Sequence, residues 1–257
     1  MSTRKIASYI QLSQFCRKET GRKAQGEAGY TILEAIVAMV VVATLMTAVA
    51  PVIVFSIGTR LQARRVELAT QAARTYIDWV SQDPIKRVTT KSGTTFNPII
   101  TEVSLTPDQM KNSRGNFTSS AAPTNSTLNC PTANDYCTAP AAPNKLFCVD
   151  FDGDGKCDSS SQRDMIVQGF RSIPNVTGAT NDPKQGYLLG VRVYRASAFQ
   201  AGVDNLVTTS ASTNVTNAIS NLSAPVVTMT TEISPTGQKG FDSYCQRLEG
   251  CGNTTSP

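Results

Sequence analysis

The 257-residue sequence contains no histidine, and only 17% of its residues are charged and 7% aromatic. Histidine is the one side chain that ordinarily gains or loses a proton near neutral pH. Its absence excludes Ser-His and Cys-His nucleophilic mechanisms and histidine-ligated metal centres. A surface enzyme that uses paired carboxylates stays an alternative, but the acidic cluster of this chain has the spacing of a metal loop rather than of two separated carboxylates. We therefore expect a protein that is not an enzyme.

Excess positive charge is scarce outside the N-terminal segment. The formal net charge is +5, but residues 1–29 hold six Lys/Arg and two Asp/Glu, which leaves 18 against 17 for the rest of the chain. A nucleic-acid-binding protein normally carries a basic face on its folded part. No nucleic acid is therefore expected as a partner.

One long segment carries no charge at all. Ala35 to Thr59 contains no Asp, Glu, Lys or Arg, and its 25 residues in a helix cover a bilayer core of about 30 Å. A secretory signal peptide has a shorter apolar core, so the length favours a retained membrane span over a removed signal or a buried core helix. Glu34 precedes this segment. A carboxylate at the bilayer edge suggests a function if it has a partner, and the alternative is that it snorkels to the lipid headgroups.

The residues around Glu34 resemble the processing site of type IV prepilins and pseudopilins. A basic leader is followed by Gly29, the aromatic Tyr30 and a Glu at the fifth position of the apolar helix. The resemblance implies that a prepilin peptidase cuts between Gly29 and Tyr30 and methylates the new N-terminus. It also implies that Glu34 pairs with the terminal amine of a neighbouring subunit and that Pro51 bends the helix. The sequence departs from the family in having Tyr30 in place of the usual Phe and a long leader. Cleavage is still expected, because the glycine and an aromatic residue after it are kept.

The apolar segment continues into an amphipathic one. From Arg60 to Val80, apolar residues recur at spacings of three, four and seven, and Asp83-Pro84 ends the pattern. This predicts a leader peptide over residues 1–29 and one helix over residues 30–83, membrane-spanning to about residue 59 and amphipathic over about 60–82. A head over residues 84–257 follows. Because the leader holds more Lys/Arg than the residues just beyond the span, we expect a single-pass inner-membrane protein with a cytoplasmic N-terminus and an external head.

The predicted fold class is α+β, with the long helix packed on a small antiparallel sheet as in pilins. Residues 89–144 are rich in Thr, Ser, Asn, Pro and Ala, so we expect long loops there and no core. Strand-like runs follow at residues 145–151, 165–171, 187–195 and 226–233. The third run alternates in the manner of a half-buried strand. A polar insertion over residues 208–224 separates the last two.

Cysteine usage predicts disulfides in the head. Cys16 lies in the leader, and the head keeps six cysteines, an even number in a segment expected outside the cytoplasm. Six cysteines allow 15 connectivities. Their grouping in the sequence favours Cys130 with Cys137, Cys148 with Cys157, and Cys245 with Cys251. A zinc site is not expected, because C-x-x-C and histidine spacings are missing.

An acidic loop lies between two of these cysteines and has the pattern D-x-D-x-D-G-x-x-D. Carboxylates at alternate positions of a loop that turns at glycine converge on one point, as calcium requires. The loop resembles those of EF-hands and thrombospondin type 3 repeats, although Ser161 stands where an EF-hand has a bidentate Glu. This departure predicts weaker binding or a ligand from elsewhere, such as Asp164. The alternative is an acidic turn between strands. The predicted calcium ligands are the side chains of Asp150, Asp152, Asp154 and Asp158 and the carbonyl of Lys156.

Two stretches further resemble the hormogonium polysaccharide secretion pseudopilins of filamentous cyanobacteria, one from Ala50 to Trp79 and one over residues 189–195. That resemblance implies a subunit of a pilus-like filament, assembled with other pilins or pseudopilins on an inner-membrane platform, that supports exopolysaccharide secretion and gliding motility. A type II secretion pseudopilin and a DNA-uptake minor pilin stay as alternatives. A membrane-anchored calcium-dependent adhesin is the alternative from another class.

Overall fold

The structure is a computed structural model that describes residues 31–112, 117, 120–124, 128–175, 181–203, 205–209, 221–234 and 245. The chain divides into two compact units, residues 1–52 and residues 53–257. Both sheets and the candidate metal site belong to the second unit.

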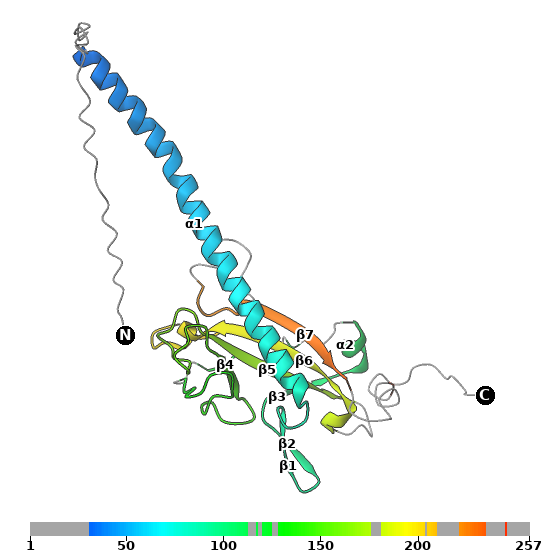
Figure 1. Ribbon diagram of the computed structural model, residues 1–257. Coiled ribbons are helices and arrows are strands. Elements are labelled where there is room, and N and C mark those ends of the chain that lie inside the picture. Colours follow the sequence, from blue (N-terminus) through cyan, green and yellow to red (C-terminus); the bar gives the residue numbers. More distant parts are fainter. Residues whose placement is uncertain are drawn as a thin grey trace, which may run out of the picture. The chain divides into compact units, whose positions relative to one another are not determined.

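The long helix expected from the sequence is present as α1 (Ile32–Gln82), a single helix of 51 residues (Figure 1). Thr31 caps its start, because the backbone N–H of Glu34 donates to the Thr31 hydroxyl at 3.3 Å. Such an N-cap satisfies one of the backbone donors that the first helical turn leaves without an internal partner. Pro51 lies inside α1 and does not end it.

The side chains of α1 have two different environments. Its first 26 residues carry large apolar side chains that are all exposed, whereas the later turns bury one stripe, which consists of Ala69, Ala72, Ala73, Tyr76 and Val80. Among the described residues, α1 is the one helix long and apolar enough to cross a membrane. An apolar segment exposed on every side cannot be stable in water, so it needs lipid or other apolar helices around it.

The head contains a five-stranded sheet. The four predicted strands are β4 (Leu146–Val149), β5 (Met165–Pro174), β6 (Tyr187–Arg195) and β7 (Val227–Ile233), and each pairs antiparallel with its neighbour. A fifth strand, β3 (Thr101–Leu105), pairs parallel with β5. The order is β3-β5-β6-β7, and β4 occupies the same edge of β5 as β3, opposite the first residues of β5. The head is therefore α+β as predicted, but this sheet is mixed.

The prediction of long coreless loops over residues 89–144 was wrong in two respects: residues 89–112 form regular elements, and the segment contributes to the core. This segment forms the hairpin of β1 (Thr89–Ser92) and β2 (Thr95–Pro98), then β3 and the short helix α2 (Pro107–Asn112). It also supplies buried apolar side chains, among them Ile100, Val103, Leu105, Met110 and Phe117. These residues are few and scattered among polar ones, so composition hides them. They are buried because the sheet that receives them is built by later parts of the chain.

β6 is buried on both faces rather than on one, which corrects the half-buried prediction. Its odd-numbered residues face α1, whereas Leu188 packs with Phe117 and Phe170 on the other face. Arg192 projects to that other face too, and its guanidinium donates to the backbone carbonyls of Phe117 and Ser120. The polar segment that the sequence assigned to loops thus covers the far face of the sheet.

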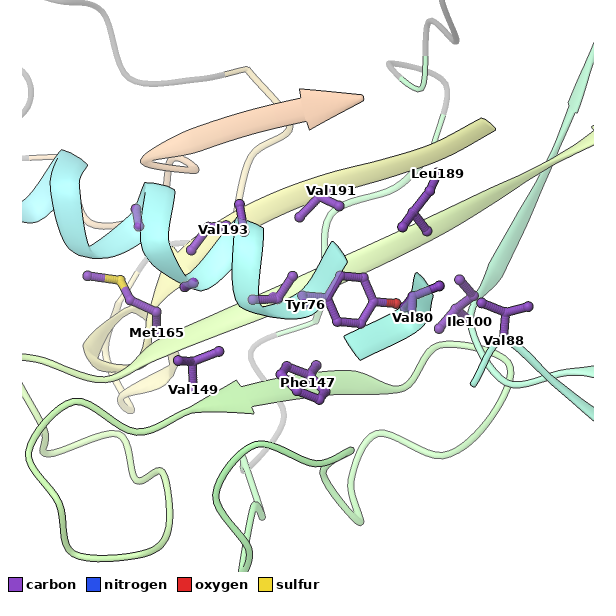
Figure 2. Close-up of a cluster of buried hydrophobic side chains, with 14 of the residues drawn as sticks. Tyr76, Val80, Val88, Ile100, Phe147, Val149, Met165, Leu189, Val191 and Val193 are labelled. Atoms are coloured by element: carbon purple, nitrogen blue, oxygen red, sulfur yellow. The ribbon is translucent and has the colours of Figure 1, made fainter. Parts of the chain in front are cut away.

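The main core lies between α1 and the near face of the sheet, as Figure 2 shows for Tyr76, Val80 and their neighbours from β4, β5 and β6. The Tyr76 hydroxyl lies 3.2 Å from that of Tyr136, which donates to the carbonyl of Arg87 at 2.7 Å. The Tyr187 hydroxyl donates to the carbonyl of Pro84 at 2.7 Å. These tyrosines connect the end of α1 to the sheet.

Candidate metal site

Two disulfides lie at the base of the candidate site. Cys148 of β4 is bonded to Cys157 and Cys130 to Cys137, which are two of the three predicted pairs. The backbone N–H of Cys157 donates to the carbonyl of Cys130 at 3.1 Å, so the two bridges lie next to each other. The third predicted pair, Cys245 with Cys251, includes a residue outside the described part of the chain.

The acidic loop begins directly after β4 and is wound around one carboxylate. The Asp150 side chain accepts hydrogen bonds from the backbone N–H groups of Asp152, Gly153 and Gly155, at 2.9, 2.6 and 2.8 Å. These bonds, above all that from Gly153, hold the pKa of Asp150 below its usual value. Gly153 and Gly155 have φ of 86° and 84°, which other residues rarely adopt. The loop is thus shaped by local hydrogen bonds and by its glycines.

Four carboxylates converge in this loop. Asp150, Asp152, Asp154 and Asp164 each offer one oxygen, and these four oxygens lie within 4.8 Å of one another. Asp164 comes from outside the repeating pattern, at the residue before β5. Carboxylate oxygens are the ligands that hard divalent cations prefer, so the group could bind a metal ion.

Asp164 differs from the other three in its burial. Its side chain is 1% exposed, its Oδ1 accepts the N–H of Phe151 at 3.1 Å, and its Oδ2 is buried with no hydrogen-bond partner. Desolvation raises the pKa of Asp164, and the charges of Asp152 and Asp150 raise it further. A buried carboxylate oxygen without a partner is costly unless a cation or a donor reaches it.

Asp158 is not a member of this group. Its carboxylate accepts hydrogen bonds from Ser160 and Ser161 in its own turn and from Lys156 Nζ at 3.2 Å. These bonds, led by that of the Ser160 hydroxyl, lower the pKa of Asp158 to about 2. The Lys156 ammonium also lies 3.7 Å from Asp154. Among the described carboxylates, Asp164 therefore occupies the place that the sequence pattern gave to Asp158.

Ser161 connects the two parts of the site. Its hydroxyl donates to Asp152 Oδ2 at 2.7 Å and accepts the N–H of Asp164 at 3.2 Å. The residue that departs from the EF-hand pattern thus positions two of the four carboxylates. The sequence did not indicate this arrangement, because it depends on how the chain turns after Asp158.

The residues around the expected cleavage site lie at the start of the described chain or before it. Gly29 and Tyr30 lie outside the described residues. Glu34 is exposed in the first turn of α1, and none of the ion pairs found among the described residues includes it. Comparison with protein-family models, curated proteins and solved structures finds no match for this chain.

Proposed function

We propose that this chain is a pilin-like structural subunit of a type IV pilus-like secretion or motility apparatus. The subunit is held in the inner membrane by α1, with its leader in the cytoplasm and its head outside. A prepilin peptidase removes residues 1–29, and α1 then packs against other pilins or pseudopilins on an inner-membrane assembly platform. The resemblance of residues 50–79 and 189–195 favours a role in exopolysaccharide secretion and gliding motility.

The observation that carries this proposal is the change of environment along α1. One helix runs from exposed apolar turns at Ile32 to turns that are buried on a sheet at Tyr76 and Val80. A membrane anchor alone would not need to be continuous with the core helix of the head. Because α1 is continuous from its apolar turns into the head, subunits that stack through this helix also bring their heads next to one another.

The capped start of α1 supports a role for Glu34 in that stacking. Thr31 caps the start of α1 and Glu34 lies in its first turn, so cleavage after Gly29 leaves the new terminal amine four residues before Glu34 in the sequence. Both groups are costly to bury in hydrocarbon alone. Pairing the carboxylate of one subunit with the amine of the next removes both costs at a single register.

The second candidate function is calcium binding in the head. We propose that Asp150, Asp152, Asp154 and Asp164 bind Ca²⁺, which accepts six to eight oxygen ligands in flexible geometry, whereas Mg²⁺ demands a near-ideal octahedron. The buried, unpartnered Oδ2 of Asp164 favours this over a solvated acidic turn. The ion would fix the residue after β4 to the residue before β5 and thereby stabilise the head.

Processing provides the test of the pilin-like role. Co-expression of the full chain with a prepilin peptidase should shorten it by residues 1–29, and mass spectrometry should find N-methyl-Tyr30 at the new terminus. Gly29→Val should block the cut because it places a branched side chain at the scissile bond. Gly26→Val, the same change three residues earlier in the leader, should leave cleavage intact. A chain that stays full length beside an active peptidase would contradict the pilin-like role.

A further inference from the structure

Two arginines lie at the end of the layer in which α1 covers the sheet. Arg65 lies four residues before Ala69 and therefore continues the stripe of α1 that is buried on the sheet. Arg195 is the last residue of β6 and lies two residues beyond Val193, so its side chain emerges on the face that α1 covers. The apolar layer between helix and sheet thus ends in a pair of guanidinium groups.

The Arg195 side chain is buried, whereas Arg65 is half-buried and only part of its guanidinium group is shielded from solvent. Arg195 is 5% exposed, its Nη2 donates to the carbonyl of Asn221 at 3.0 Å, and its Nε is buried with no partner. Arg65 Nη1 is likewise buried with no partner. None of the ion pairs found in the described part of the chain includes either arginine. Burial lowers the pKa of Arg195, and the charge of Arg65 lowers it further.

The other two buried arginines of the sheet are compensated. Arg171 forms an ion pair with Glu102 and also donates to the side chain of Asn181 at 2.8 Å. Arg192 donates to two backbone carbonyls and lies 4.6 Å from the centre of the Phe170 ring. Arg171 Nε is also buried without a partner, but Arg171 has a carboxylate and Arg192 two carbonyl acceptors, whereas Arg195 has one carbonyl acceptor among the described residues. Two adjacent like charges with free donors attract an anion.

We propose that Arg65 and Arg195 form a binding site for an oxyanion, that is, a carboxylate, sulfate or phosphate group. Guanidinium groups suit this chemistry because their planar forks match the spacing of the oxygens of an oxyanion. The group can come from a free anion or from an acidic side chain of a second copy of the chain. This site does not depend on the pilin-like role or on calcium, since neither enters its geometry.

Thermal unfolding of the full chain in detergent tests the site. Inorganic sulfate should raise the Tm relative to chloride at equal ionic strength, by roughly 3 to 5 °C for each tenfold increase above its Kd. Arg65→Gln and Arg195→Gln should lose this rise. Arg64→Gln removes the same charge from an exposed neighbour on α1 and should keep it. In chloride alone, Arg65→Gln should not lower the Tm, because it relieves repulsion.

A direct binding measurement makes the result independent of stability. Equilibrium dialysis with labelled sulfate should give one saturable site in the wild type and in Arg64→Gln, and none in either site variant. If the oxyanion is an acidic side chain of a second copy, the Tm of the wild type should instead rise with protein concentration in sulfate-free buffer. Arg65→Gln should abolish that rise. Equal binding in all variants, or no response of either kind, would overturn the proposal.

Discussion

Tyr76 of α1 lies so close to Gly169 of β5 that a Cβ atom at position 169 would fall 2.1 Å from the Tyr76 hydroxyl oxygen. The missing side chain lets α1 approach the sheet closely enough to bury Tyr76 completely. The buried ring then contacts the rings of Trp79, Tyr136 and Phe147. One glycine in the middle of a strand thus sets the distance between helix and sheet.

Gly169→Ala should therefore destabilise the head. The added methyl group overlaps a buried ring, and overpacking of this kind typically costs about 1–3 kcal/mol. In a Tyr76→Leu background the same substitution should cost clearly less, because the atoms that it meets are gone. Chemical denaturation of the four members of this double-mutant cycle measures the coupling. An equal cost of Gly169→Ala in both backgrounds would show that the contact does not set the packing.

Calcium should stabilise the head through Asp164 and not through Asp158. At a hundredfold excess over Kd, a ligand that binds only the folded state contributes about 2.7 kcal/mol, which corresponds to roughly 5–10 °C in Tm. Asp164→Asn should abolish the rise, and so should Asp152→Asn with Asp154→Asn. Asp158→Asn is the matched control and should keep it, because the Asp158 carboxylate is held by Ser160 and Lys156. Calorimetry of the full chain in detergent, with and without a chelator, provides the measurement.

The outcome of that comparison separates the two interpretations of the loop. If Asp158→Asn loses the calcium response and Asp164→Asn keeps it, the ligand set of the sequence pattern is right and the one proposed here is wrong. If all variants melt at the same temperature with and without calcium, the loop is an acidic turn.

Glu34→Leu should leave membrane insertion and peptidase cleavage intact but prevent assembly. The substitution removes a charge at the bilayer edge, so insertion does not suffer, whereas the pairing with the amine of Tyr30 on the next subunit is lost. Incorporation into filaments can be followed by shear fractionation and immunoblotting. Glu67→Leu, at an exposed position beyond the membrane segment, is the control and should still assemble. Normal assembly of Glu34→Leu would mean that the carboxylate is a bystander.

The buried tyrosines should make stability fall in alkali. Burial raises the pKa of Tyr76, Tyr136, Tyr187 and Tyr194, that of Tyr194 to about 12. In the unfolded chain these phenols ionise near pH 10, so above that pH the folded state binds more protons than the unfolded state. Stability is therefore unaffected below about pH 10 and is lost as the pH rises toward 12.

Ultraviolet titration of phenolate absorbance measures this effect. In the native protein a group of tyrosines should ionise only at a pH well above 10, together with unfolding. In denaturant all seven tyrosines should titrate together near pH 10. Tyr187→Phe should remove one late phenol. Titration of all seven near pH 10 under native conditions would contradict the burial of this cluster.

The sequence by itself determined the elements whose signal is local. The apolar run and the stripe from Leu61 to Val80 suffice for one long helix, because helix periodicity is read from neighbours three and four residues apart. Strand-like runs located β4 to β7, and cysteine grouping predicted the pairs Cys130 with Cys137 and Cys148 with Cys157. The D-x-D-x-D-G pattern likewise placed three of the four converging carboxylates.

Tertiary structure alone decided the contacts made at long range. β3 is parallel to β5 because residues about 70 positions apart meet at one sheet edge, and no local pattern encodes that pairing. Asp158 stays outside the carboxylate cluster because the turn after it uses that side chain for its own hydrogen bonds. A residue's own neighbours in sequence fix its secondary structure, but its burial and its charge partners are fixed by whatever distant segment the folded chain lays against it.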